Sequence, residues 1–184
     1  SKWAVVYIPG VIDLINSSTP YTFNAQQATY LQPVAVTRML GAIASANKNI
    51  MPKIKSVAPL KIDGEEIAAG APLDKLIAVA HKSADQPAQQ LAFELVLRSL
   101  AEQKDVPVLV AIDDVQALFA MSWYRDPDFR PMRSFELAVP RARVQAVADE
   151  LVRVAAVSAH DRYDFTEQVA RAWRRLRARR PVQA

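Results

Sequence analysis

The sequence predicts an α/β fold in which a parallel sheet is flanked by helices, with long ordered loops and a helical C-terminal part. Two apolar segments, 3–8 and 108–112, have the composition of buried parallel strands. Between them lie three segments in which apolar residues recur at helical spacing. Strands that alternate with helices are typical of α/β domains, but two strands are too few for a complete doubly wound sheet. We therefore expect part of a larger sheet.

The first strand is followed by a polar, turn-rich segment, 13–33. Aromatic side chains are spaced through it, so we expect an ordered loop that its aromatics clamp in place. These side chains are Tyr21, Phe23 and Tyr30. A helix should begin at Pro33, because the missing amide of proline costs nothing in the first helical turn. The segment 51–72, with three prolines and two glycines, predicts a second irregular connector.

Each of the three predicted helices has an apolar face. In the first two helices, these faces consist of Val36, Met39, Leu40 and Ile43, and of Leu73, Leu76, Ile77 and Ala80. In the third, near 88–103, apolar residues cover more than half of the circumference. These residues are Leu91, Phe93, Leu95, Val96, Leu97 and Leu100. We therefore expect the third helix to be largely buried, against the sheet.

The strand 108–112 reads as buried on both faces and runs directly into Asp113 and Asp114. Desolvating a carboxylate is costly, so these acids need an explanation. In open α/β sheets ligands bind at the carboxyl ends of the strands, where an acid can hold a metal or a nucleotide. Alternatively, Asp114 caps a helix that begins at Val115, and Asp113 shapes the turn. The residues alone leave both interpretations open.

The amino-acid composition limits the classes of protein to which the chain can belong. The 184 residues suffice for one domain or a piece of a larger one. Without cysteine there is no disulfide framework and no thiolate metal site, and the two histidines are not at a metal-ligand spacing. No apolar run approaches the length of a membrane span. The first residues resemble neither a signal nor a transit peptide, so we expect the chain to begin inside a domain.

Basic residues suggest contact with RNA in two places. Between 122 and 141, arginines alternate with Trp123, Tyr124 and Phe129, a combination that suits phosphate and unstacked bases. The segment 171–180 holds six of the 23 basic residues. The candidate RNA-binding residues are Arg125, Arg130, Arg133, Arg141, Arg171, Arg174, Arg175 and Arg179. The alternatives are aromatics that pack inward in the first segment and a solvated helix face in the second.

Three segments carry a more specific signal: "WAVVYIPGVIDLINSSTPY" at 3–21, "YLQP" at 30–33, and "PVLVAIDDVQALFAMSWYRDPDFRPMRSFELAVPR" at 107–141. They closely resemble fungal mitochondrial small-subunit ribosomal proteins of the death-associated protein three family. The resemblance implies a P-loop NTPase core related to AAA+ proteins, bound GTP or GDP with Mg²⁺, and a place in the head of the mitochondrial small ribosomal subunit. It fades after Arg141. We therefore expect a partial P-loop NTPase-like α/β domain at 1–141 and a helical, basic segment at 142–184.

The resemblance assigns roles to both aspartates. The strand 108–112 corresponds to the Walker B strand, so Asp113 is its Mg²⁺-binding acid and, with Asp114, a candidate nucleotide-binding residue. The family usually has glycine where this chain has Asp114. No glycine begins a GxxxxGK[ST] phosphate loop here, and in the family that loop lies upstream of the segment matching Trp3. The chain therefore resembles a member without its N-terminal third, and autonomous hydrolysis is not expected.

The expected function is that of a structural, non-enzymatic component of the mitochondrial small ribosomal subunit in the matrix. Such a component contacts ribosomal RNA and neighbouring ribosomal proteins, and no membrane. Its guanine-nucleotide site is incomplete in this chain. Two alternatives are a nucleotide-hydrolysing P-loop switch and a protein-interaction module without a nucleic-acid role.

Overall fold

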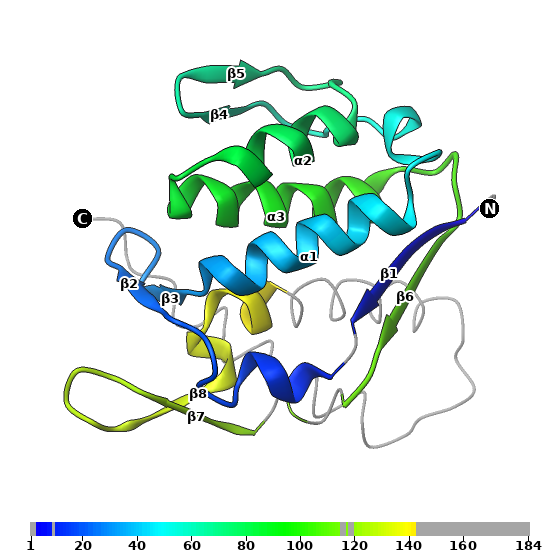
Figure 1. The fold of residues 1–184 in the computed structure, drawn as a ribbon. Coiled ribbons are helices and arrows are strands. Elements are labelled where there is room, and N and C mark those ends of the chain that lie inside the picture. The colour runs from blue at the N-terminus through cyan, green and yellow to red at the C-terminus, as the bar shows by residue number, and fades with distance from the viewer. Residues whose placement is uncertain (1–2, 9, 115–116, 118–119, 143–184) are drawn as a thin grey trace. The chain divides into compact units, whose positions relative to one another are not determined.

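Figure 1 shows the computed structural model, which describes residues 3–8, 10–114, 117 and 120–142. By its internal contacts the chain divides into two compact units, residues 1–141 and 142–184. Beyond Ala142 the second unit lies outside the described residues, so its helical and basic character stays a prediction. Within the described ranges, no helix is long and apolar enough to cross a membrane.

The predicted parallel strand pair is confirmed. β1 (Ala4–Ile8) pairs with β6 (Val108–Ile112) in a two-stranded parallel sheet, with Ala4 opposite Val108 and Ile8 opposite Ile112. Figure 1 shows the two arrows side by side, although about a hundred residues separate them in sequence. This pairing brings the ends of both strands, and the residues that follow them, to one edge of the sheet.

The expectation that β6 is buried on both faces is wrong. The side chains of Leu109 and Val110 are each 49% exposed, and no β6 residue is fully buried. In the described part of the chain β1 is the only strand that pairs with β6. The helix that covers the sheet, α1 (Pro33–Ala46), packs against β1. Among the described residues β6 is therefore an edge strand with apolar side chains on its surface.

The three predicted helices are present, but their arrangement differs from the expected one. α1 begins at Pro33 as predicted, and α2 (Leu73–Lys82) buries the predicted face. α3 (Gln86–Glu102) packs against α1 and α2, whereas we expected it against the sheet. Most of its apolar residues are buried by the other two helices, but Leu91 is exposed.

Three antiparallel hairpins lie in the predicted loop 13–33, in the predicted connector 51–72 and in the segment with the candidate arginines. These are β2 (Thr22–Asn24) with β3 (Thr29–Leu31), β4 (Leu60–Ile62) with β5 (Glu65–Ile67), and β7 (Met121–Arg125) with β8 (Pro131–Arg133). Asp63 and Gly64 form the turn of the second hairpin, both with positive φ, as a two-residue type I′ turn requires. Short 3-10 helices lie at Val11–Leu14, Met51–Lys53 and Ser134–Glu136.

The buried side chain of Asn47 fixes α1 to β1. Its Oδ1 accepts a hydrogen bond from Val5 N at 2.6 Å, and its Nδ2 donates to Val5 O at 2.7 Å. The same Nδ2 donates to Ile43 O at 2.7 Å, on the last turn of α1. The amide thus satisfies both backbone groups of Val5 as a neighbouring strand would.

Candidate functional site

Asp113 and Asp114 follow β6 at the edge where both strands end. Asp113 N donates to Ile8 O at 3.0 Å, and Asp113 O accepts from Val11 N at 3.3 Å. The exposed carboxylate of Asp113 accepts from the amide of Asp114 at 3.0 Å, so it shapes the turn as one interpretation predicted. Asp114 has φ 55°, a left-handed conformation that glycine adopts freely and aspartate tolerates. This backbone would accept glycine at least as readily as aspartate, which is consistent with the glycine expected here from the sequence resemblance.

The described residues do not by themselves fit a nucleotide with magnesium. Among them, no three His, Cys, Asp or Glu side chains lie close enough together to hold a metal ion. A nucleotide also needs backbone amides and a lysine around its phosphates, and the sequence has no phosphate loop. Asp113 is an acid at the expected place, but the phosphate loop that would complete its site is missing from the sequence. The predicted helix start at Val115 lies outside the described residues.

The second candidate site is the β7–β8 hairpin, whose side chains alternate between two faces. Met121, Trp123 and Arg125 are exposed, whereas Ser122 and Tyr124 are buried. Trp123 is 67% exposed, yet its amide donates to Ile15 O at 2.7 Å. The hairpin is therefore fixed to the body of the protein while its outward face stays open.

Hydrogen bonds organise the tip of this hairpin. Asp126 Oδ1 accepts from the amides of Asp128 at 2.9 Å and Arg130 at 2.8 Å. Arg125 Nη1 donates to Phe129 O at 3.2 Å, and the Arg130 guanidinium pairs with Asp128 at 3.2 Å. Phe129 has φ 60° and is 82% exposed, a strained and unburied state for a large apolar residue. The tip thus presents an aromatic ring to solvent.

An aromatic cluster joins the β2–β3 hairpin to β7. The Tyr21 ring meets Tyr124 edge-on at 4.9 Å between centroids and Tyr30 at 5.8 Å, and Phe23 lies 5.0 Å from Tyr30. The Tyr21 hydroxyl donates to Arg125 O. Partial burial raises the pKa of Tyr30, as do the nearby negative charges of Asp126 and Glu136. The expected clamp of aromatics is confirmed, but Tyr124 completes it from a distant segment.

The remaining candidate arginines are placed differently. The Arg133 side chain is exposed on β8, and its amide donates to Glu136 Oε2 at 2.6 Å. Arg141 is exposed and donates to Gln27 O at 3.4 Å, beside the turn of the β2–β3 hairpin. Burial raises the pKa of Glu94, and the hydrogen bond from Gln90 and, to a smaller extent, the positive charge of Arg141 oppose that rise. Arg125, Arg130 and Arg133 thus share one hairpin and Arg141 does not.

The other four candidates lie outside the described residues: Arg171, Arg174, Arg175 and Arg179.

Comparison with known proteins shows which family the chain belongs to. The family described as mitochondrial ribosomal death-associated protein 3 matches residues 1–163. The chain is a member of this family. It is also similar to the small ribosomal subunit protein mS29 of Neurospora crassa, with 26% identity over 142 residues. That alignment covers 76% of this chain and 30% of the relative, so the chain spans about a third of the length of that relative.

Membership of the death-associated protein 3 family confirms the family expected from the sequence, and with it a mitochondrial location. The family match continues past Arg141 to residue 163, further than the sequence resemblance suggested. It includes Asp113, Asp114 and the β7–β8 hairpin, but it ends before the basic segment 171–180. The described candidate sites therefore lie within the part of the chain that the family shares.

Proposed function

We propose that the chain is part of a structural component of the mitochondrial small ribosomal subunit that contacts ribosomal RNA through the β7–β8 hairpin. Family membership and the name of the relative support the ribosomal role. The RNA contact rests on one observation: Trp123 and Phe129 are exposed on the same hairpin as three exposed arginines.

Physical chemistry favours RNA for this combination of side chains. Exposed aromatic rings stack on unpaired bases, and guanidinium groups bind phosphate oxygens. Tyr124 is fully buried, so it takes no part in stacking and instead anchors the strand that carries Trp123. The outward face is therefore where RNA binds, and the inward face holds the hairpin in place.

A titration with fluorescently labelled single-stranded RNA at several salt concentrations tests this proposal. Replacing Arg125 and Arg133 with glutamine should weaken binding for all sequences and make the salt slope shallower by about 0.7 for each phosphate that is no longer neutralised. Trp123→Ala should weaken binding and leave that slope nearly unchanged, because stacking releases no counterions. The Lys61→Gln/Arg98→Gln control removes two exposed charges elsewhere and should bind like the parent chain. Unchanged affinity and slope in the hairpin variants would exclude this surface.

We propose that the guanine-nucleotide site of this chain is incomplete. Asp113 and Asp114 supply its acidic side chains, and the part that would hold the phosphates is missing. Isothermal titration calorimetry of the chain with GTP and Mg²⁺ should detect no binding, because the sequence has no phosphate loop. The same segment joined to a phosphate loop of its family should bind, and Asp113→Asn should weaken that binding. Tight binding by residues 1–184 alone, or none by the joined protein, would contradict this proposal.

A further inference from the structure

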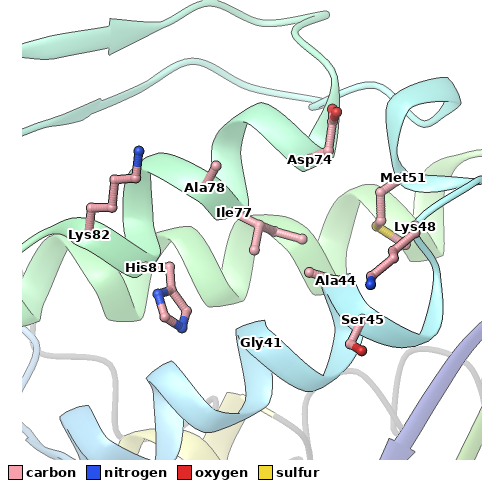
Figure 2. Close-up of a pocket in the computed structure, with 10 residues that line it drawn as sticks. All are labelled: Gly41, Ala44, Ser45, Lys48, Met51, Asp74, Ile77, Ala78, His81 and Lys82. Atoms are coloured by element: carbon pink, nitrogen blue, oxygen red, sulfur yellow. The ribbon is translucent and has the colours of Figure 1, made fainter.

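A groove runs between α1 and α2, on a surface distinct from the β7–β8 hairpin. Two cavities of about 470 and 610 Å³ lie along it and share Gly41 and His81 in their walls. Figure 2 shows the side chains around the first cavity, with His81 on α2 above Gly41 on α1. A Cβ added at Gly41 would lie 3.6 Å from His81 Nε2, so the two helices approach closely there.

Both helices line the groove with residues at helical spacing. Along α1 and just beyond its end, the lining residues are Val34, Thr37, Arg38, Gly41, Ala44, Ser45 and Lys48. On α2 they include Asp74, Ile77, Ala78 and His81. Each set repeats the i, i+3, i+4, i+7 pattern of one helix face; on α1 this face is opposite to the core face, and on α2 it adjoins the core face and shares Ile77 with it. Together the two cavities follow α1 over most of its length, a rise of about 20 Å, and beyond the end of α2 the wall opposite α1 is formed by Ser83, Ala84, Gln86 and Gln89.

The floor of the groove is apolar around the first cavity, whereas Ser83, Gln86 and Gln89 line the second. Gly41, Ala44 and Ala78 are small residues, and Ile77 and Met51 close the bottom. Small residues let another helix approach closely, and the ridges of its side chains fit between the two helices. The groove offers no aromatic ring besides His81 for stacking a base. Its shape favours a helix over a nucleic acid.

The rim of the groove carries unbalanced positive charge. Arg38, Lys48 and Lys82 are exposed around it, and none forms an ion pair with the described residues. Asp74 is the single acid among the lining residues of the two cavities. A complementary occupant therefore carries carboxylates on both sides of an apolar stripe.

We propose that the α1–α2 groove binds an amphipathic α-helix of a partner protein, whose apolar stripe is flanked by glutamate or aspartate. Such a helix places anchors at i, i+3, i+4 and i+7 into a hydrophobic groove, and this groove repeats that spacing on both walls. The acids of the partner meet Arg38, Lys48 and Lys82. This interaction goes beyond the proposed RNA contact and does not depend on it.

Two synthetic helical peptides of roughly 20 residues, long enough to be helical once stapled, serve as probes. One carries a leucine–alanine stripe flanked by glutamates, and the other has glutamine at the same flanking positions. Fluorescence anisotropy with the full chain should give about tenfold tighter binding for the glutamate peptide, as three exposed ion pairs would produce. That advantage should shrink as salt rises. Equal binding of the two peptides, or no binding of either, would overturn the proposal.

Matched variants locate the contact. Ala44→Trp fills the groove and should abolish peptide binding, whereas Ala42→Trp, on an exposed part of α1 outside it, should not. Lys48→Glu/Lys82→Glu should remove the preference for the glutamate peptide, whereas Lys61→Glu/Lys104→Glu should keep it. Circular dichroism confirms that each variant is folded.

Two other occupants give distinguishable results. Single-stranded RNA that displaces the glutamate peptide equally well from the parent chain and from a hairpin variant would assign the groove to RNA and overturn the proposal. Self-association that Ala44→Trp abolishes, in sedimentation velocity without peptide, would assign the groove to a second copy and also overturn it.

Discussion

At the scale of single residues, a few buried polar groups fix segments that are far apart in sequence. The Tyr124 hydroxyl, inside the protein, hydrogen-bonds to Thr19 Oγ1 at 2.7 Å and accepts from Thr19 N at 3.3 Å. Asn47 is 2% exposed and makes three hydrogen bonds through one amide. Removing one partner of such a contact leaves the other without its hydrogen bond in a place that water reaches poorly.

Tyr124→Phe removes this hydroxyl while keeping the buried ring. We expect the free energy of unfolding to fall by about 1 to 2 kcal/mol, because both hydrogen bonds to Thr19 disappear. Urea titration followed by fluorescence measures the change. Tyr7→Phe is the control, since Tyr7 is exposed, and it should leave stability nearly unchanged. A decrease of equal size in both variants would show that the Thr19 hydrogen bonds contribute nothing.

Asn47→Ala removes the amide that links α1 to β1. We expect the free energy of unfolding to fall by about 2 to 3 kcal/mol, since the amide and carbonyl of Val5 both lose their partner. Thermal melting by circular dichroism detects the change. Asn49→Ala, two residues further along at an exposed position, should change the melting temperature little. Similar effects of the two substitutions would contradict the role given to Asn47.

Sequence reasoning placed the two aspartates correctly and could not choose between their roles. Asp113 follows a parallel strand as predicted, and its carboxylate shapes the turn. The left-handed backbone of Asp114 was not foreseen, because its local sequence does not specify φ. The partners of Asn47 and Tyr124 were also missed. Contacts between residues 42 or 105 positions apart leave no periodic signal in a single sequence.

At the scale of elements, helices were predicted well and hairpins were missed. The faces of α1 and α2 follow from apolar spacing within one turn, which the sequence displays directly. The strands of the three hairpins are three to five residues long, too short for alternation to be evident. Asp63-Gly64 was the one readable signal, a dipeptide typical of two-residue hairpin turns.

The β7–β8 tip gives a prediction at this scale, because Phe129 is both strained and exposed. Phe129→Asn should raise the free energy of unfolding by roughly 0.5 to 1 kcal/mol, since asparagine tolerates a left-handed backbone. The same change should weaken RNA binding. Phe23→Asn, which removes the ring contact with Tyr30, should instead lower stability. A destabilised Phe129→Asn variant would show that the ring makes a structural contact.

At the scale of the whole described unit, the sheet is small and its apolar surface is incompletely covered. The α/β class and the parallel pair were predictable, because buried strands and helices have distinct periods. The exposure of β6 was not, since it depends on which neighbours are present. The composition of β6 fits a central strand, yet among the described residues β1 is the only strand that pairs with it.

Leu109 and Val110 therefore predict how the isolated chain behaves. Replacing both with threonine should reduce aggregation, seen as lower light scattering during heating, and change the unfolding free energy by under about 1 kcal/mol. Val6→Thr, at a buried position of β1, should destabilise the protein instead. If the double threonine variant aggregates as fast as the parent, another surface drives association.

The amide of Asn47 also makes the sheet directional. It occupies both backbone groups of Val5, so a further strand cannot add to β1 at that point, whereas no described strand occupies the outer edge of β6. If two copies joined through their β6 edges, both β1 edges of the joined sheet would lie on the outside and be blocked at Val5. The side chain that follows α1 thereby limits the growth of such a sheet on its β1 side.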